Sequence, residues 1–266
     1  MVIEVKELGV TYYPIPKCGS SSLKYALMAL AGRETAVSAD PENDVHDHLY
    51  TNYVDAFSAL LDGKDGRFTI VRDPLERLLS AYSGRILKAK VLNYPSTNFE
   101  RVARFGLPLD PDLDTFILNI EQYCACSEEI RLHVASPRHF IGDSLFAFDR
   151  VFKFDQMDSV EAFLSSASGR PVQLRRLQSS DRKVTASDMS SEALAKAMRF
   201  CRYDYGFLVD YYDPARWGGI PKGDPGEFSS LHVVRHPALV HGRIVYPRTL
   251  SNLGRFLGKQ SMQYRR

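Results

Sequence analysis

One short segment constrains the fold of this chain more than any other. Residues 16–22, PKCGSSS, join a predicted strand, Val10 to Tyr13, to a predicted helix. The strand is rich in β-branched and aromatic residues and ends at prolines, while the helix carries leucines at helical spacing and stops near Gly32. The three serines are candidate N-caps of that helix. A strand, a tight loop and a helix therefore follow one another directly.

The composition of this loop favours an anion-binding site. Its small residues allow backbone N–H groups to close around an anion, the helix N-terminus adds partial positive charge, and Lys17 adds a full charge. The loop differs from the ATP-binding Walker A loop, GxxxxGK[ST], because its lysine precedes the glycine. The segment predicts a phosphate cradle, for which ATP is the weaker candidate.

A second strand and helix follow the same plan. Residues 67–71, RFTIV, read as a strand and lead into a helix with Asp73 as N-cap, Pro74 at its first position and Glu76 at its third. Two such units predict an α/β fold with a central parallel sheet flanked by helices, a P-loop-like three-layer architecture.

The rest of the chain divides into a domain and an arm. We expect helices over 112–122, 127–135, 160–167 and 190–203, and a strand over 150–154. Prolines and glycines crowd the stretch after Tyr212. The predicted boundary near Asp213 gives a domain over 1–212 and a C-terminal extension or arm over 213–266.

Composition excludes several classes of protein. The chain has 266 residues and a net charge of +2, which is too low for nucleic-acid binding to be inferred from charge. Four cysteines without regular spacing predict reduced thiols. No apolar run approaches the roughly 20 residues of a membrane span, and the N-terminus lacks the form of a signal peptide. We expect a cytoplasmic protein; a lumenal catalytic domain that had lost an N-terminal anchor would look the same.

The loop 16–22 and the second unit together resemble a known family. PKCGSSS after a strand is similar to the 5'-phosphosulfate loop of sulfotransferases that use PAPS (3'-phosphoadenosine 5'-phosphosulfate), in particular the membrane-type carbohydrate branch. The family's second signature is an arginine at a strand end with a serine eight residues later, and Arg72 and Ser80 match it. The resemblance extends over about residues 9–212, with weaker matches at 148–157 and 203–207.

The resemblance implies a role for each residue of the two motifs. PAPS would be the donor and PAP the product. Lys17 would stabilise the leaving phosphate oxygen, and Arg72 and Ser80 would hold the 3'-phosphate. The 5'-phosphate would be bound by the loop residues Lys17, Cys18, Gly19, Ser20, Ser21 and Ser22.

A histidine pair between the motifs is the candidate for the catalytic base. Residues 44–50, DVHDHLY, resemble the corresponding segment of uronosyl 2-O-sulfotransferases, in which a histidine is the base. The register favours His48, and His46 could assist or bind the acceptor. An unperturbed histidine titrates in the range that such a base needs. A metal site and solvated loop histidines are the alternatives. A metal needs more ligands than two imidazoles and nearby carboxylates guarantee, and the reaction requires no metal.

The acceptor is expected to be a hydroxyl of a saccharide. Candidate acceptor residues combine aromatic and basic side chains: Tyr50, Tyr53, Arg85, Lys88, Lys90 and Tyr94. The basic stretch 173–183 matches loosely a loop that closes over the donor, which makes Arg182 and Lys183 weak candidates. The thiol of Cys18, at a helix N-terminus, is expected to have a lowered pKa.

Two other functions compete with this prediction. A P-loop kinase or other NTP-dependent phosphotransferase shares the strand, loop and helix, but the Walker A lysine and a convincing magnesium carboxylate are missing. A non-catalytic module that binds a nucleotide or glycan is the second alternative, disfavoured by the presence of both Lys17 and His48. The sequence predicts neither the acceptor hydroxyl nor the oligomeric state.

Overall fold

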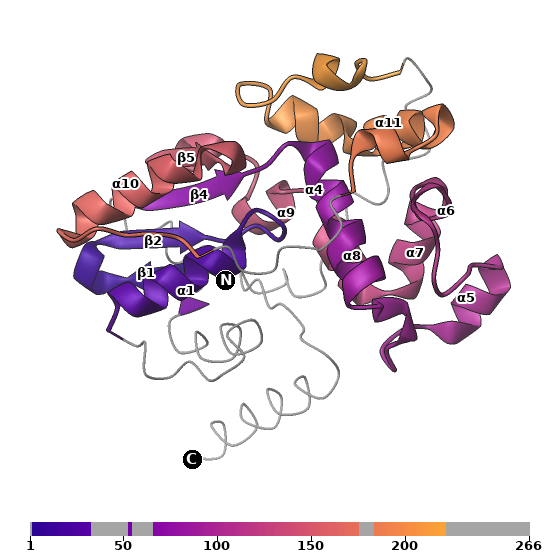
Figure 1. The fold of residues 1–266 in the computed structure, drawn as a ribbon, viewed down its shortest axis with the longest axis horizontal. Coiled ribbons are helices and arrows are strands. Elements are labelled where there is room, and N and C mark those ends of the chain that lie inside the picture. The colour runs from indigo at the N-terminus through magenta and orange to yellow at the C-terminus, as the bar shows by residue number, and fades with distance from the viewer. Residues whose placement is uncertain (1, 33–52, 55–65, 176–183, 222–266) are drawn as a thin grey trace.

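A five-stranded mixed sheet is the centre of the computed structural model, which describes residues 2–32, 53–54, 66–175 and 184–221 (Figure 1). Its strands lie in the order β3-β1-β2-β4-β5. Their bounds, in that order, are Tyr53–Val54, Val2–Val5, Val10–Tyr13, Arg67–Val71 and Arg150–Lys153.

The predicted parallel sheet is confirmed for the three strands that the sequence identified. β2 pairs parallel with β4, and β4 pairs parallel with β5. The first strand, β1, was not predicted and pairs antiparallel with both β2 and β3. A short 3-10 helix, η1 (Lys6–Leu8), and Gly9 with φ +61° reverse the chain between β1 and β2. Glycine adopts this left-handed conformation without steric cost, so the reversal is tight.

Helices flank the sheet and extend to one side of it. They are α1 (Ser20–Leu30), α4 (Pro74–Ala81), the π-helix η4 (Tyr82–Lys88), α5 (Phe99–Phe105), α6 (Leu113–Leu118), α7 (Ile120–Cys126), α8 (Glu128–Val134), α9 (Arg138–Ile141), α10 (Met157–Ser168) and α11 (Ser191–Phe207). Short 3-10 helices are η5 (Val91–Asn93), η6 (Leu145–Ala147), η7 (Phe154–Gln156), η8 (Ala186–Asp188) and η9 (Pro214–Trp217).

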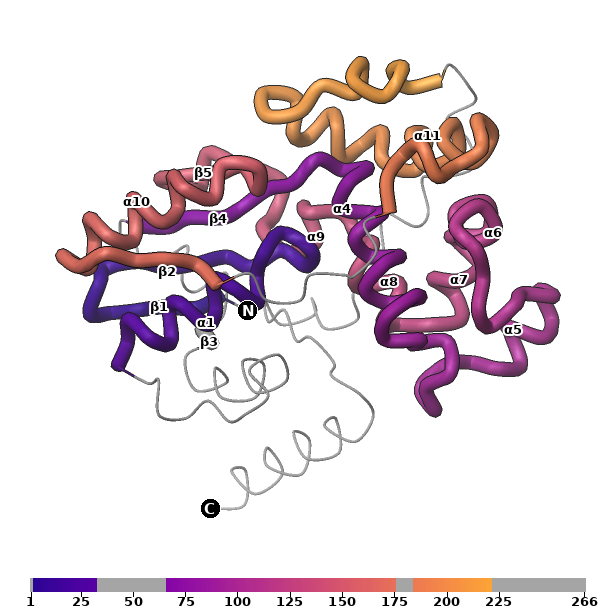
Figure 2. The backbone as a smooth tube through the Cα atoms, in the orientation of Figure 1, coloured from indigo at the N-terminus to yellow at the C-terminus, as the bar shows by residue number. Residues whose placement is uncertain are grey.

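Helix α4 connects the sheet with the helical part of the domain. It packs against α8 and α11, and α5 to α8 form a group on the side of α4 away from the sheet (Figure 1). The chain from α11 to residue 221 returns above the end of β4, as the tube in Figure 2 shows in orange and yellow. The carboxyl end of β4 is therefore enclosed by segments that are distant in sequence.

Side-chain caps explain where several helices begin. Asp73 accepts a hydrogen bond from the N–H of Glu76, as the sequence predicts, and Ser127 and Ser190 cap α8 and α11. The single helix predicted over 112–122 is wrong. It is two helices, α6 and α7, because the chain leaves the helical conformation at Asn119, where φ is −113°.

Aromatic contacts tie the parallel strands together. Tyr12 of β2 stacks on Phe68 of β4 with ring centroids 5.2 Å apart, and Phe68 meets Phe163 of α10 at 5.2 Å. Offset and edge-to-face pairs of this kind stabilise beyond the area they bury. This core fixes β2 and β4 side by side, so the loops that leave their carboxyl ends lie next to each other.

The described helices contain no segment that is both long and apolar enough to cross a membrane. The cytoplasmic location and the domain boundary remain predictions. Residues 222–266, most of the predicted arm, lie outside the described residues.

Candidate anion-binding site

The loop between β2 and α1 presents the N-terminus of a helix that has no side-chain cap. α1 begins at Ser20, and its N-cap is Gly19, whose φ of +74° is the left-handed conformation. The prediction that the serines are N-caps is wrong: all three lie in the first helical turn. Gly19 has no side-chain oxygen that could cap the first turn of α1. An anion is the ligand that such an end binds.

Lys17 lies in this loop under strain and in a cationic environment. Its φ of +68° is uncommon for a residue with a side chain. Burial, followed by the charges of Arg85, Arg72 and Lys88, lowers the pKa of Lys17 to about 8. The neighbouring cations disfavour the charged form of Lys17, so this group of side chains carries excess positive charge. A bound anion would offset that charge.

The side chain of Lys17 passes along the π-helix η4. A Cβ atom built on Gly84 would collide with Nζ of Lys17. Glycine at position 84 therefore leaves the space that the amine occupies. Such π-helical turns occur frequently at functional sites.

Cys18 differs from its neighbours because its thiol belongs to the core. The residue is completely buried, and burial raises the pKa of its thiol to about 11. The expectation of a lowered pKa is wrong because desolvation outweighs the cationic surroundings and the helix end. Its N–H donates to the carbonyl of Ile15 over 3.3 Å, so this amide is engaged within the loop.

Arg72 joins the second predicted motif to the first. Its Nη1 donates a hydrogen bond to the carbonyl oxygen of Lys17 over 3.1 Å. Its guanidinium also lies over the ring of Phe154, 4.4 Å from the centroid. Phe154 in turn faces the loop, because a Cβ on Gly19 would lie 3.1 Å from its Cε2.

The guanidinium of Arg72 retains unused donor capacity. Burial lowers the pKa of Arg72, and its Nε is buried without a hydrogen-bond partner among the described residues. The nearest carboxylate, that of Glu76, lies 3.9 Å from Nε. This Nε could donate a hydrogen bond to an anionic ligand.

Ser80 lies on the helical face between these two contacts. Glu76, Ser80 and Gly84 follow one another at intervals of four residues, and all three are half-buried among buried neighbours. Glu76 pairs with Arg72 at one end of this face, and Gly84 lies against Lys17 at the other. The structure therefore brings Lys17, Arg72 and Ser80 to one side of the helix formed by α4 and η4.

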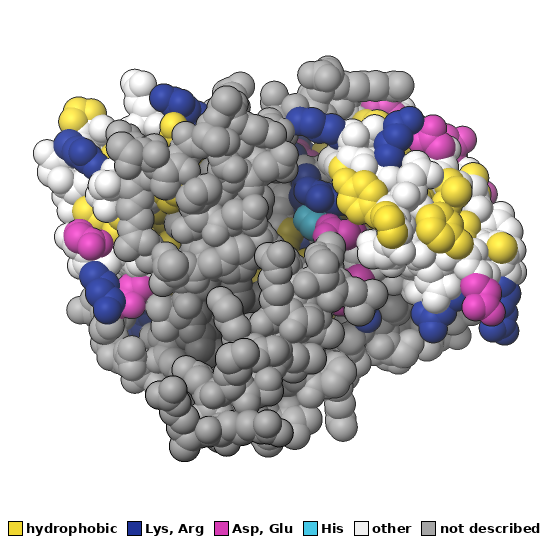
Figure 3. All heavy atoms as spheres, turned by 90° about the horizontal axis from the view of Figure 1, so that it is seen from below, with side chains coloured by type: hydrophobic (Ala, Val, Ile, Leu, Met, Phe, Trp, Pro, Cys, Tyr) yellow, Lys and Arg dark blue, Asp and Glu magenta, His cyan; other side chains and the backbone are white. Residues whose placement is uncertain are grey.

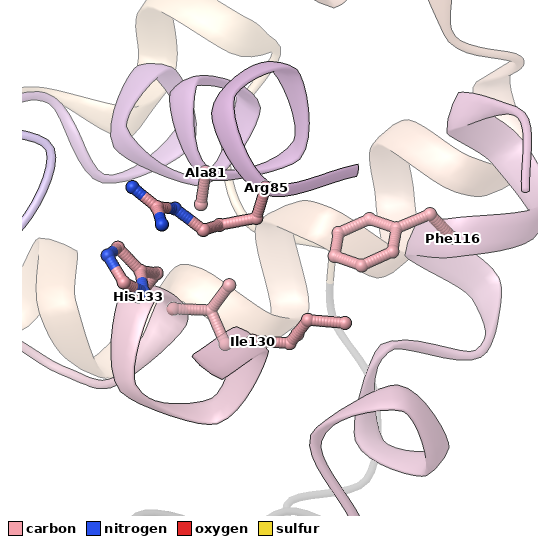
Figure 4. A pocket seen from close by; sticks show the side chains of 6 residues that line it. Ala81, Arg85, Phe116, Ile130 and His133 are labelled. Atoms are coloured by element: carbon pink, nitrogen blue, oxygen red, sulfur yellow. The ribbon is translucent and has the colours of Figure 1, made fainter. Parts of the chain in front are cut away.

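Arg85 connects the cluster to α8. Its Nη1 lies 3.7 Å from Oε2 of Glu129, and the same oxygen lies 3.5 Å from Nδ1 of His133. Figure 4 shows Arg85 reaching toward His133 across a small pocket, which is too narrow to hold a water molecule. Its lining residues are Ala81, Arg85, Phe116, Ile130, His133 and Val134. On the face in Figure 3, basic, histidine and acidic side chains lie together where the described surface recedes.

The other predicted site residues are less closely associated with this cluster. Lys90 pairs with Asp110 at 3.8 Å, with both side chains exposed, and Tyr94 is 40 % exposed. From the basic stretch 173–183, Arg175 stacks on Tyr25 of α1 at 5.0 Å. The candidates that lie outside the described residues are His46, His48, Tyr50, Arg182 and Lys183.

Asp73 is occupied by structural hydrogen bonds. Its carboxylate accepts from the N–H of Glu76, from the hydroxyl of Tyr205 at 3.0 Å and from Nε1 of Trp217 at 3.2 Å. A carboxylate with three donors has little capacity left for a magnesium ion. This arrangement removes the one candidate that the kinase hypothesis had for its metal.

Three neighbours of the site were missed in the sequence. Gly84 interrupts a helical pattern, which is itself a signal of close packing. Phe154 follows a predicted strand, but nothing in the sequence links it to Arg72. Trp217 lies beyond the predicted boundary and yet bonds Asp73.

Comparison with known proteins assigns the chain to a family. A sequence profile described as "Sulfotransferase family" matches residues 2–214. The chain belongs to the sulfotransferase family. The match includes both motifs of the site and thereby confirms the resemblance found in the sequence.

Curated relatives of this sulfotransferase-family chain are carbohydrate sulfotransferases. Carbohydrate sulfotransferase 10 of Danio rerio is 36% identical over 86 residues, which is 30% of this chain and 23% of the relative. The protein of the same name from Homo sapiens is 33% identical over 85 residues, 29% of this chain and 24% of the relative. The chain thus matches about a quarter of the length of these relatives. No solved structure matches it significantly.

Proposed function

We propose that this protein transfers a sulfuryl group from PAPS to a hydroxyl group of a carbohydrate. The observation that carries the proposal is the hydrogen bond from Arg72 to the carbonyl of Lys17, because it joins two separate cationic elements into one site. PAPS has phosphates at its 5' and 3' positions, so a donor site needs two such elements. The saccharide acceptor is carried over from the relatives, whose name specifies carbohydrate sulfotransferases.

Each group has one task in the proposed reaction. The acceptor oxygen bonds to sulfur while the bond from sulfur to the 5'-phosphate oxygen breaks, and PAP leaves. His48 takes the proton of the hydroxyl, and the ammonium of Lys17 stabilises the charge on the leaving oxygen. The uncapped N-terminus of α1 binds the 5'-phosphate, while Arg72 and Ser80 bind the 3'-phosphate. Arg85 and Lys88, whose charges act on Lys17, bind the acceptor in this proposal.

The donor site is tested by comparing PAP with 5'-AMP, which lacks the 3'-phosphate. Calorimetric titration of the wild type is expected to show micromolar binding of PAP and much weaker binding of AMP. Arg72→Ala should remove this preference, whereas Arg104→Ala, an exposed arginine on α5, serves as the matched control and should retain it. Equal binding of PAP and AMP by the wild type would refute the proposed donor.

The base is tested separately with the two histidines of the pair. His48→Ala should lower kcat of sulfation by about a hundredfold or more and leave PAP affinity unchanged. His46→Ala tests the other histidine of the pair, and it should retain most of the turnover if His48 is the base. The result that contradicts the assignment is full activity of His48→Ala in a saccharide sulfation assay with PAPS.

A further inference from the structure

The turn that carries Arg72 is held from outside by the last described part of the chain. This turn leaves β4 at Val71 and enters α4 at Pro74. Residues 212–217 lie against it, and we call them the C-terminal strap. The family match ends at residue 214, within this strap.

The strap fixes the backbone on both sides of Arg72. The hydroxyl of Tyr212 donates to the carbonyl of Val71 over 3.1 Å, in a buried position. Nε1 of Trp217 donates to the two carboxylate oxygens of Asp73 over 3.3 and 3.2 Å. The residues immediately before and after Arg72 therefore each accept a hydrogen bond from the strap.

The strap also acts on the side chain of Arg72 through a shared carboxylate. Nη2 of Arg216 lies 3.2 Å from Oε1 of Glu76, whose other oxygen lies 3.9 Å from Nε of Arg72. The guanidinium of Arg216 stacks on Trp217 with 4.6 Å to the ring, so both strap residues form one unit. The carboxylate of Glu76 lies closer to Arg216 than to Arg72, so less of its charge neutralises the guanidinium of Arg72.

The strap has its own local order. The carboxylate of Asp213 accepts from the N–H of Ala215 over 2.8 Å, and Gly218, with φ +87°, ends the turn. It is therefore a preformed turn, and ordering it requires little further loss of entropy.

We propose that the C-terminal strap positions Arg72 for the 3'-phosphate, with Trp217 as the principal positioning residue; the inference rests on the proposed donor site. Trp217 does not touch the nucleotide in this proposal. It acts through Asp73, which caps α4 and sets the direction in which Arg72 leaves the turn.

The test is the preference for PAP over 5'-AMP in strap variants, measured by calorimetry on the full chain. Trp217→Phe keeps an aromatic ring but removes the N–H donor, and it should weaken PAP binding about five- to tenfold. This is less than the full effect of a lost hydrogen bond to a charged group, because Asp73 keeps its bonds from Glu76 and Tyr205. AMP binding should change by less than about twofold. Tyr123→Phe, on α7, removes a hydrogen bond to the carbonyl of Pro108 at 3.0 Å, away from the strap, and should leave the preference unchanged.

A second variant and a spectroscopic signal make the test decisive. Arg216→Gln alters an exposed residue, so it should fold, and it should weaken PAP about two- to threefold with little effect on AMP. Trp217 is the single tryptophan of the chain, so PAP but not AMP should change the intrinsic fluorescence of the wild type. If Trp217→Phe does not fold, the role of the strap is decided by the PAP preference of Arg216→Gln and by the fluorescence response of the wild type to PAP.

The two possible failures are distinguishable. A wild type without preference for PAP over AMP overturns the proposed donor site itself. A wild type with that preference, retained in full by both strap variants, overturns only the role of the strap. Equal weakening of PAP binding and AMP binding in Trp217→Phe would indicate a general loss of structure. That result would also overturn the role of the strap.

Discussion

The amine of Lys17 occupies the place that a Cβ atom on Gly84 would take, on the π-helix that follows the Arg72 motif. A methyl group at position 84 would occupy the place of Nζ. The helix therefore defines where the charge of Lys17 is held, although the two residues are far apart in sequence.

Replacing Gly84 with alanine should displace the charge of Lys17. The backbone of Gly84 is helical, so alanine fits the local conformation and the collision with Nζ is the main effect. We expect kcat of sulfation to fall about ten- to hundredfold, as for a displacement of about 1 Å in a catalytic group. Gly206→Ala is the matched control, because nothing lies within 4 Å of a Cβ at this position of α11. Equal activity of both variants would show that the position of the amine is unimportant.

Donor binding should depend on pH through Lys17. Its pKa in the unliganded protein is about 8, and a bound phosphate raises it, so binding is coupled to protonation. PAP affinity should be constant from about pH 7, which is above the second pKa of about 6 of a phosphate monoester, to about pH 7.5, and it should fall above about pH 8 with a slope approaching tenfold per pH unit. Calorimetry between pH 6 and 9.5 measures this dependence. Lys17→Arg, which stays charged, should abolish the decline, and a decline that persists in that variant assigns it to another group.

Phe154 should contribute to donor affinity through Arg72. A guanidinium over an aromatic ring gains about 0.5–2 kcal/mol, so Phe154→Leu should weaken PAP binding roughly two- to thirtyfold. Phe154→Tyr keeps the ring face and should bind PAP nearly as the wild type does. Phe146→Leu is the control, since Phe146 is fully exposed. Unchanged PAP affinity in Phe154→Leu would remove Phe154 from the site.

Arg77 should stabilise the fold without contributing to binding. It is buried, donates to the carbonyl of Ala135 at the end of α8 over 2.6 Å, and lies 3.4 Å from Asp204. Arg77→Met leaves the carboxylate of Asp204 buried without its cation, which should lower the free energy of unfolding by about 3–5 kcal/mol. Urea denaturation measures this loss. The double variant Arg77→Met, Asp204→Leu should recover part of it, and no recovery would mean that the ion pair is not the cause.

Local sequence signals predicted the elements that carry the site. The strand and helix before and after Asp73 were predicted because a capping aspartate, a proline and a glutamate stand in order at 73, 74 and 76. The loop at 16–22 was predicted for the same reason, since a lysine and small residues stand between a strand and a helix. These signals depend on neighbours in sequence, and they describe the two motifs well.

Features that depend on distant contacts were not predictable. β1 is four residues long and pairs antiparallel, and no periodicity in VIEV distinguishes it from a loop. The pKa of Cys18 was predicted in the wrong direction because burial cannot be read from the loop sequence. The contacts of Lys17 with Gly84, and of Asp73 with Trp217, arise only when the chain folds.

The π-helical turn also sets the angle about the helix axis between Ser80 on α4 and the basic residues Arg85 and Lys88 on η4. The N–H of Ala89 donates to the carbonyl of Gly84, five residues earlier, so the turn accommodates one residue more than an α-helix would. If the same residues continued as a regular α-helix, everything after Tyr82–Lys88 would be rotated by about 100° relative to Ser80. Lys88, at the end of the turn, would then be carried away from Lys17, on which its charge acts. The additional residue thus shifts the phase of the helix, so that the residues after it are turned independently of Ser80.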